Sequence, residues 1–313
     1  MRRLIEAALE NFYAFTLVLV RMAGLMTIGP VFGQPVVPGN IRILLVLAMS
    51  LLMMPLLHEQ SRIGFRRLDA NQDSRLTRDE LPEQLHARFD RRLAQTGHLT
   101  GDSLTETEFA MSAQIPSSIL DYARIAVAEF ALGLVLGVGV LTILSGLQLA
   151  GELIDQQTGI SLGEVANPGL EISGSLTGQF FFLTGVTIML LLEPIGGHLM
   201  MVSALVETFQ TLPIGEATLS IPAIELLASL VHQSLVLGIQ VAAPLLATMS
   251  LVALTMGFLG HTVPQINVLV IGFPIRASIS LIVLAVAMSG VGRAVVDVIP
   301  GVIDNLRHAI TFL

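Results

Sequence analysis

Long stretches without any charged residue alternate with shorter polar segments along the chain. The charge-free windows are residues 22–41, 43–57, 130–151, 172–192, 226–275 and 277–292. A helix needs about 20 apolar residues, each adding about 1.5 Å, to cross the hydrocarbon of a bilayer. Because the longest window is sufficient for a span and the turn after it, the pattern predicts an all-α fold of polytopic, membrane-type helical hairpins with about six long apolar helices.

The breaks between the windows give the expected helix boundaries. We predict helices over residues 4–27, 42–57, 122–154, 175–201, 223–259 and 275–298. Prolines and glycines end the first helix, and further prolines kink later helices near residues 194 and 244. Four parts follow: a first helix pair (1–57), a polar insertion (58–117), long helices around a central glycine-rich loop (118–222), and a kinked C-terminal hairpin with a tail (223–313).

Composition agrees with a membrane protein. Of the 313 residues, 53% are hydrophobic and 13% are charged, and the mean hydropathy is +0.78, which is far more apolar than an average soluble domain. The formal charge of −8 argues against nucleic acid as a partner, and the absence of cysteine excludes disulfides and thiol catalysis. No Ser/His/Asp set, phosphate-binding loop or zinc-ligand spacing occurs, so we do not expect an enzyme.

One segment differs abruptly from the rest. Residues 58–121 hold eleven acids and eight arginines, 19 of the 40 charged residues in the chain, so we expect a small soluble insertion that faces water. Within it, six positions have the spacing of a calcium-binding EF-hand loop, and calcium prefers six to eight oxygen ligands. Positions one, three, five, seven, nine and twelve of that loop are Asp69, Asn71, Asp73, the carbonyl of Arg75, Thr77 and Glu80.

Two further features of the EF-hand-like loop affect the calcium prediction. Leu76, at position eight, is expected to pair with a neighbouring loop, and residues 104–109 repeat the second half of the pattern without the first ligands. Ser74 occupies position six, where glycine normally supplies a positive φ, so binding should be weakened. The alternative is a solvated helical hairpin whose acids only keep it soluble.

The passage from Gly151 to Gly169 is a glycine-rich, acid-bearing segment between two charge-free runs. Irregular backbone at membrane depth persists only where protein covers it or where it lines a water-filled space. We therefore interpret this passage as the working part of a membrane assembly.

The sequence leaves open whether two charged residues in the flanking helices are interfacial or buried, and three glycines there predict close helix packing. Arg21 is either an interfacial side chain or one member of a buried pair, and Glu129 could be interfacial. The glycines at 133, 137 and 139 have the spacing that allows membrane helices to approach closely.

Several motifs together resemble one known family. They are Pro264-Gln-Ile-Asn-Val-Leu-Val-Ile-Gly-Phe-Pro274, Arg21 with Pro30-Val-Phe-Gly, the 151–169 passage, and Thr208-Phe-Gln-Thr-Leu-Pro-Ile-Gly215. The chain is similar to the FliR family, the R subunits of the flagellar type III secretion export gate, with the equivalent subunits of injectisomes as close relatives. The resemblance covers the whole chain except residues 58 to about 117.

The resemblance implies a structural subunit that completes a helical ring of P and Q subunits around the export pore. It implies an FlhB-type switch protein and exported flagellar proteins in transit as partners, and a location in the bacterial inner (cell) membrane at the flagellar basal body. A plug loop is implied at Gly151, Glu152, Ile154, Gln157, Gly159, Ser161, Pro168 and Gly169. A partner-contacting hairpin tip is implied at Pro264, Gln265, Asn267, Gly272, Phe273 and Pro274.

A different class of function also fits the residues. A calcium-regulated solute transporter or ion channel could use residues 151–169 as a re-entrant filter, although no internal repeat of the kind found in transporters is visible. By analogy with the P subunit, the insertion is expected outside the cytoplasm. The distribution of arginines opposes this orientation, but the positive-inside rule is weak for long loops.

Overall fold

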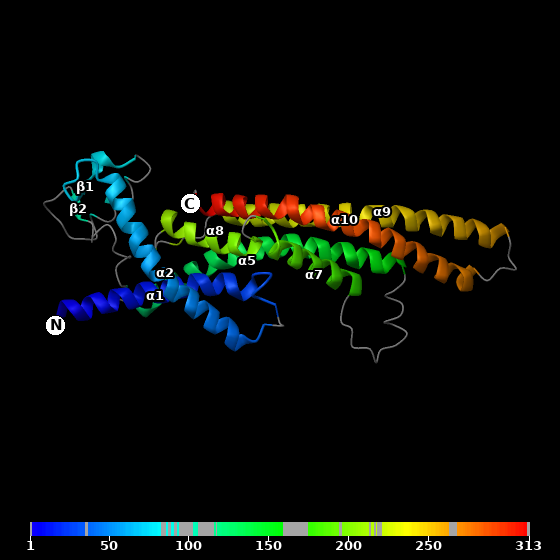
Figure 1. Cartoon of the computed structure of the whole chain (residues 1–313), viewed down its shortest axis with the longest axis horizontal. Coiled ribbons are helices and arrows are strands. Elements are labelled where there is room, and N and C mark those ends of the chain that lie inside the picture. The colour runs from blue at the N-terminus through cyan, green and yellow to red at the C-terminus, as the bar shows by residue number, and fades with distance from the viewer. Residues whose placement is uncertain are drawn as a thin grey trace.

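The computed structural model describes residues 2–34, 37–82, 86, 89–90, 93, 103–105, 116, 118–158, 175–193, 196–212, 214–215, 217, 221–262 and 268–311 of the chain. The fold is an elongated bundle of helices (Figure 1). The N-terminus and a small unit with two strands lie at one end, and the end of α9 with the start of α10 lies at the other.

Seven α-helices are described, with two short strands and one 3-10 turn. They are α1 (Arg2–Ile28), α2 (Gly39–Leu68), β1 (Arg75–Thr77), η1 (Arg78–Glu80), β2 (Ser103–Thr105), α5 (Ile119–Thr158), α7 (Leu176–Leu190), α8 (Gly197–Thr211), α9 (Ile221–Thr262) and α10 (Val268–Thr311).

Helix α5 forms the centre of the bundle. It packs against α1, α7, α8, α9 and α10, and residues such as Leu136, Val140 and Leu147 are fully buried. A helix that is apolar all round is stable only when neighbours or lipid cover every face, and in α5 the neighbours come from both halves of the chain. All remaining parts are therefore positioned relative to α5.

The crossing of α1 and α5 is unusually close. A side chain at Gly24 of α1 would overlap the backbone of Phe130, and one at Gly133 of α5 would overlap the backbone of Arg21. Gly137 lies one turn further along, against Gly29. The close approach predicted from the glycine spacing is confirmed at Gly133 and Gly137, and it brings the two helix backbones into direct contact.

The number and ends of the helices differ from the sequence prediction. Five helices are long and apolar enough to cross a membrane, and α7 and α8 are shorter, so the prediction of six long helices is not confirmed. The expected helix over 175–201 is two helices separated near Glu193, and α8 continues to Thr211, where a loop was predicted. Gly196 has φ 80°, a conformation that breaks a helix and suits glycine.

Helices α10 and α2 both contain prolines and continue past their predicted ends. Helix α10 contains both Pro274 and Pro300 and continues through the expected tail to Thr311, and α2 contains Pro55 and reaches Leu68. Proline removes one backbone hydrogen bond, but packing of adjacent turns can retain the helix. In α10 that packing is visible, since Val302, Ile303 and Leu306 are buried beyond Pro300.

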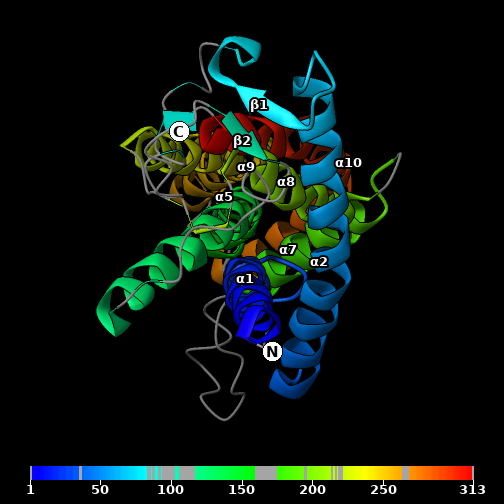
Figure 2. The same cartoon turned by 90° about the vertical axis from the view of Figure 1, so that its left-hand side faces the viewer.

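The insertion has its own small core at the end of α2. Strands β1 and β2 pair antiparallel with Leu76 opposite Leu104, and both leucines are fully buried with Phe65, Leu81 and Phe89. Figure 2 shows this unit above the end of the bundle, carried on α2. The predicted pairing of Leu76 with the second loop is confirmed.

Much of the outer surface of the bundle is apolar. Only 17% of the residues between Gly39 and Leu57 in α2 are buried, and Ile43, Leu281 and Phe258 are more than two-thirds exposed on α2, α10 and α9. Such a surface requires lipid or partner proteins around it.

We predict that Gly133→Ala destabilises the protein, because the added methyl group must force two backbones apart. The expected loss is about 1–3 kcal/mol, the usual effect of overpacking. Gly290→Ala is the matched control on α10, where nothing lies within 4 Å of the added carbon, and it should be neutral or slightly stabilising. Thermal unfolding in detergent, followed by circular dichroism, compares the two; equal midpoints would contradict the close crossing.

Candidate functional site

A fully buried ion pair between α1 and α5 is completed by groups at the end of α8. Arg21 of α1 donates from Nε to Oε2 of Glu129 on α5 at 2.5 Å, and neither side chain is exposed. The remaining guanidinium donors bind Oγ1 of Thr208 and the carbonyl oxygen of Leu212, at 3.1 Å each. The other carboxylate oxygen of Glu129 accepts the backbone N–H of Gly215 at 2.7 Å.

The end of α8 and the turn after it complete this site. The Phe209 ring lies 4.0 Å from the guanidinium carbon of Arg21, and Gly215 has φ 85°, which directs its N–H toward the glutamate. The motif Thr208 to Gly215, noted in the sequence for its resemblance to a family, thus surrounds a charge pair. The buried-pair alternative for Arg21 is confirmed, and the interfacial placement considered for Glu129 is wrong.

A second buried acid joins the end of α5 to the start of α7. Asp155, near the end of α5, accepts hydrogen bonds from the hydroxyl of Ser175 at 2.6 Å and from the backbone N–H of Thr177 at 3.1 Å. It also accepts from the Thr177 hydroxyl. One turn earlier, a side chain at Gly151 would overlap the backbone of Gly178, so α5 and α7 are in contact on both sides of the intervening residues.

These contacts change the extent of the predicted plug loop. Gly151, Glu152, Ile154 and Gln157 belong to α5, so a loop beginning at residue 151 is wrong. Ile154 is 1% exposed and packs in the main core. The helix persists because Ile154 and Asp155 gain packing and hydrogen bonds there. Four other predicted plug residues lie outside the described residues, namely Gly159, Ser161, Pro168 and Gly169.

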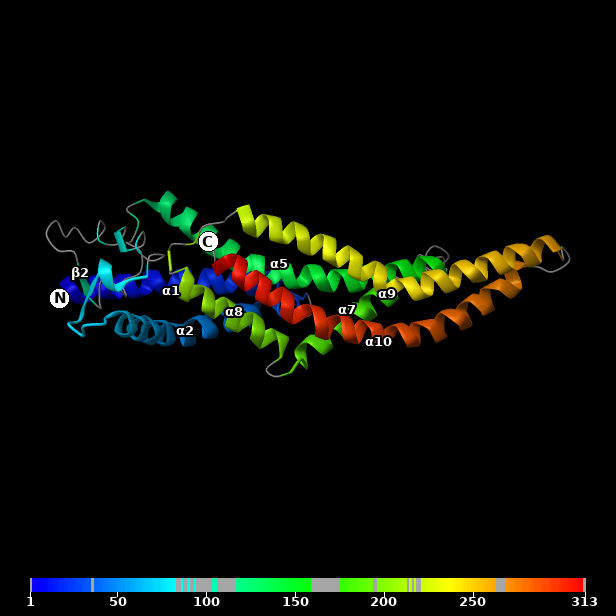
Figure 3. The ribbon, with the colours of Figure 1, turned by 90° about the horizontal axis from the view of Figure 1, so that it is seen from above.

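The predicted hairpin tip is likewise more helical than expected. Gly272, Phe273 and Pro274 lie within the first turns of α10, while Pro264, Gln265 and Asn267 lie outside the described residues. Figure 3 shows α9 and α10 running antiparallel and projecting together beyond the end of α5. The end of α9 and the start of α10 therefore lie at the far end of the molecule.

The six residues predicted to bind calcium lie in one turn between α2 and η1. Asp69 ends α2 and is buried, Asn71 and Asp73 are exposed in the turn, and Arg75 and Thr77 begin and end β1. The carboxylate of Glu80 accepts from the backbone N–H and the hydroxyl of Thr77, both at 2.8 Å. The hydrogen bond from this N–H holds the pKa of Glu80 below its usual value, so the side chain is ionised at neutral pH.

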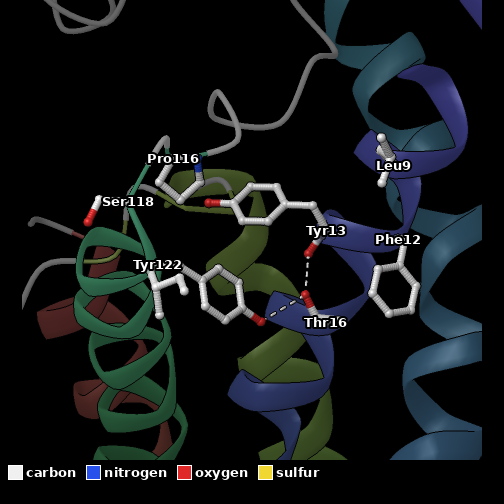
Figure 4. A pocket seen from close by; sticks show the side chains of 8 residues that line it. Leu9, Phe12, Tyr13, Thr16, Pro116, Ser118 and Tyr122 are labelled. Carbon is white, nitrogen blue, oxygen red and sulfur yellow. Dashed lines mark hydrogen bonds between the residues drawn. The ribbon is translucent and has the colours of Figure 1, made fainter. Parts of the chain in front are cut away.

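A pocket of about 320 Å³ lies between the start of α1 and the start of α5 (Figure 4). The rings of Tyr13 and Tyr122 meet there at a centroid distance of 5.9 Å, and Tyr122 donates to Oγ1 of Thr16 at 3.2 Å. The residues that line this pocket include no carboxylate, amine or imidazole: they are Leu9, Phe12, Tyr13, Thr16, Pro116, Ser118, Ile119 and Tyr122. This lining offers no acid–base or metal chemistry.

Comparison with known proteins identifies the family. A family model described as bacterial export proteins, family 1, matches residues 12–300. The chain belongs to this family. The flagellar biosynthetic protein FliR of Bacillus subtilis (strain 168) is 29% identical to it over 203 residues, which is 63% of this chain and 77% of that protein.

Other similar proteins come from both flagellar and virulence systems. FliR of Escherichia coli (strain K12) is 29% identical over 164 residues, 52% of this chain and 62% of that protein. The Yop proteins translocation protein T of Yersinia pestis is 28% identical over 160 residues, 50% of this chain and 60% of that protein. The resemblance to flagellar R subunits, with injectisome relatives, is confirmed.

Family membership and composition together give the location. Among the described residues of this bacterial export protein, five helices are long and apolar enough to cross a membrane, so it is a protein of the bacterial inner membrane, as the sequence predicted. Its partners are, in general terms, components of an export apparatus.

Sequence reasoning missed the role of Asp155. The signal that could have found it is Ser175, a helix N-cap residue immediately before an apolar run. Its hydroxyl accepts the N–H of Gly178 at 2.8 Å. When a single acid lies near the end of one apolar helix and such an N-cap residue begins the next helix, the pattern predicts that the acid and the cap meet.

We predict that Glu129→Gln destabilises this export protein strongly, because it leaves the charge of Arg21 buried without a counter-charge. The expected loss is about 3–5 kcal/mol. A double variant with Arg21→Met and Glu129→Leu should lose less than the sum of its single variants, since both buried charges are then removed.

Arg307→Gln is the control for the ion-pair prediction. It removes a partly exposed pair with Glu207, and exposed pairs contribute about 0–1 kcal/mol. Unfolding midpoints of the purified variants in detergent measure each loss. A Glu129→Gln loss no larger than that of the control, or strictly additive effects in the double variant, would contradict the buried pair.

Proposed function

We propose that this chain is a non-enzymatic structural subunit of the flagellar type III protein-export gate, located at the flagellar basal body. In this proposal it completes the pore formed with P and Q subunits, and residues 159–174 form the plug of that pore. One observation supports the plug above all others: a buried carboxylate, Asp155, ties the two ends of this segment together.

The hydrogen bonds of Asp155 to Ser175 and Thr177, called the Asp155 clamp below, would hold the base of the proposed plug in place. A closing segment must be held firmly at its base while its tip moves, and the donors from Ser175 and Thr177 fix the base at two points of α7. The contact of Gly151 with Gly178 adds a second constraint one turn away. These contacts leave only residues outside the described part of the chain, 159–174, for the proposed plug.

The apolar side chains that would close the pore lie beyond the clamp and not within α5. Ile154 is buried between the helices of this chain and is not available to line a lumen. The apolar residues beyond the clamp, Ile160, Leu162 and Val165, remain as the residues that close the pore by excluding water.

The exposed apolar faces suit the proposed assembly. Helix α2 buries few of its residues within the chain. Helices α9 and α10 project beyond the end of α5 (Figure 3), and both expose large apolar side chains such as Leu254, Phe258 and Leu281. We propose that P and Q subunits cover these helices and that an FlhB-type switch protein meets the tip at residues 263–274. Exported flagellar proteins would pass through the pore so formed.

The orientation of the chain follows from the same proposal. The insertion and the α9–α10 tip lie at opposite ends of the bundle (Figure 1). If the tip faces the cytoplasm, where the switch protein acts in the proposed gate, the insertion lies on the outer side of the inner membrane.

A transporter or ion channel is the second candidate, and the buried charges argue against it. A transported ion or polar solute needs ionisable groups that are free to bind it. In the described part of the helical bundle, Arg21, Glu129 and Asp155 are the buried charged side chains, and each already has partners within the chain.

We predict that deletion of Ser161 to Gly169 makes cells that produce the gate permeable to small ions and solutes. The deletion leaves the Asp155 clamp in place, so the chain should still assemble. Influx of a small dye and loss of membrane potential measure the leak, with assembly checked by co-purification of the partner subunits. Normal ion tightness of an assembled deletion variant would disprove the plug.

Asp155→Asn should produce a weaker leak in the same assay, because the amide can accept fewer hydrogen bonds from Ser175 and Thr177 and the base of the loop is loosened. Asp121→Asn is the matched control, an exposed acid in the first turn of the same helix, and it should leave permeability unchanged. An Asp155→Asn gate that assembles and is as tight as the control would show that the clamp does not position the plug.

A further inference from the structure

The carboxylate of Asp69 in the insertion has one satisfied oxygen and one oxygen without a partner. Oδ2 accepts the backbone N–H of Ser74 across the turn at 3.0 Å. Oδ1 is buried and has no hydrogen-bond partner, and the residue as a whole is only 8% exposed. Oδ2 is thereby tied across the turn, and burial of an unpaired oxygen of a charged group is costly unless something binds it.

Two further side-chain oxygens of the turn accept backbone N–H groups. Asn71 accepts the N–H of Asp73 at 2.9 Å, and Asp73 accepts the N–H of Arg75 at 2.7 Å. Ser74 has φ 61°, the left-handed conformation that the sequence pattern requires at this position. The chain therefore adopts the sharp turn even though serine replaces the usual glycine.

We propose that the turn from Asp69 to Glu80 binds one calcium ion, with Oδ1 of Asp69 as the first ligand. The ligand atoms available to a metal ion are carboxylate, amide, carbonyl and hydroxyl oxygens, which suit a hard cation. Calcium accepts six to eight such ligands in flexible geometry, whereas magnesium needs a nearly regular octahedron and retains water. The turn also follows the C-terminal end of α2, where the helix dipole favours positive charge.

Binding requires the ligand side chains to rearrange. In the described part of the chain, no three acidic or histidine side chains converge closely enough to hold a metal. The carboxylate of Glu80 is held by Thr77, and Oδ2 of Asp73 accepts from the side-chain amide of Asn71 at 3.2 Å. Bidentate ligation needs the Glu80 carboxylate to leave Thr77 and turn toward Asp69. The ion would thereby fix η1 against the end of α2 and stabilise the β1–β2 pair beside it.

The site is connected to the gate through a single helix. Helix α2 contributes Val46 and Met53 to the main core and Phe65 to the core of the insertion. Calcium bound at its end would therefore order a unit carried directly by the helical body, on the end of the molecule opposite the α9–α10 tip.

The test is calcium titration of the purified full-length protein in detergent after treatment with a chelator. Calorimetry should show one site, and Glu80→Gln should weaken binding at least about tenfold, since even loss of a supporting residue outside the ligand shell costs about 10–100-fold at metal sites. Asp79→Asn is the matched control, an exposed neighbouring acid outside the ligand set, and it should bind as tightly as the parent. Equal heats for the parent and Glu80→Gln would overturn the proposal.

A gain-of-function variant tests the same geometry in the opposite direction. Ser74→Gly removes the strain of a left-handed serine and should tighten calcium binding about fivefold, equivalent to about 1 kcal/mol. Unchanged or weaker affinity would contradict the assigned turn. Equal affinity for magnesium would contradict the choice of calcium.

Hydrogen exchange provides a measurement that does not depend on the Glu80 variant being folded. In the parent protein, calcium should slow exchange of the backbone amides of Arg75 to Thr77 and of Ser103 to Thr105, while the amides of α5 stay unchanged. Exchange that is identical with calcium and with chelator would overturn the proposal.

Discussion

The ion pair of Arg21 and Glu129 is the interaction on which the bundle depends. Two charges removed from water are stable only when their hydrogen-bonding groups find partners, and here the partners come from α8 and the turn after it. The pair therefore stabilises one arrangement of α1, α5 and α8 and excludes others in which helices slide along apolar faces. Close packing of glycines at the α1–α5 crossing makes this arrangement sterically possible.

Both proposed working segments begin at an aspartate near the C-terminal end of a helix. Such a position is electrostatically unfavourable, because the helix dipole places partial negative charge there. For Asp155 the N-terminus of α7 compensates, through the N–H of Thr177. For Asp69 the compensation within the chain is incomplete, since one oxygen has no donor. The same physical criterion thus distinguishes an acid that clamps a loop from one suited to a cation.

The sequence predicted the class of fold and the elements that local chemistry determines. Charge-free windows located the apolar helices, and the regular spacing of acids located the turn after α2 together with its partner at Leu104. Helix ends were less predictable: Pro55, Pro274 and Pro300 lie inside helices, and beyond Pro300 buried side chains stabilise the helix despite the lost hydrogen bond. The clamp at Asp155 depends on residues 20 and 22 positions away, a distance that no local pattern encodes.

The separation of the two hydrophobic cores explains how one chain can carry both segments. The core of the insertion is distinct from that of the bundle, and α2 alone is described as belonging to both. Perturbations in distant sites without shared partners are usually additive. Loss of the Arg21–Glu129 pair and loss of calcium should therefore act independently on stability, unless α2 transmits the effect. A non-additive result would identify α2 as the mechanical link between the insertion and the gate.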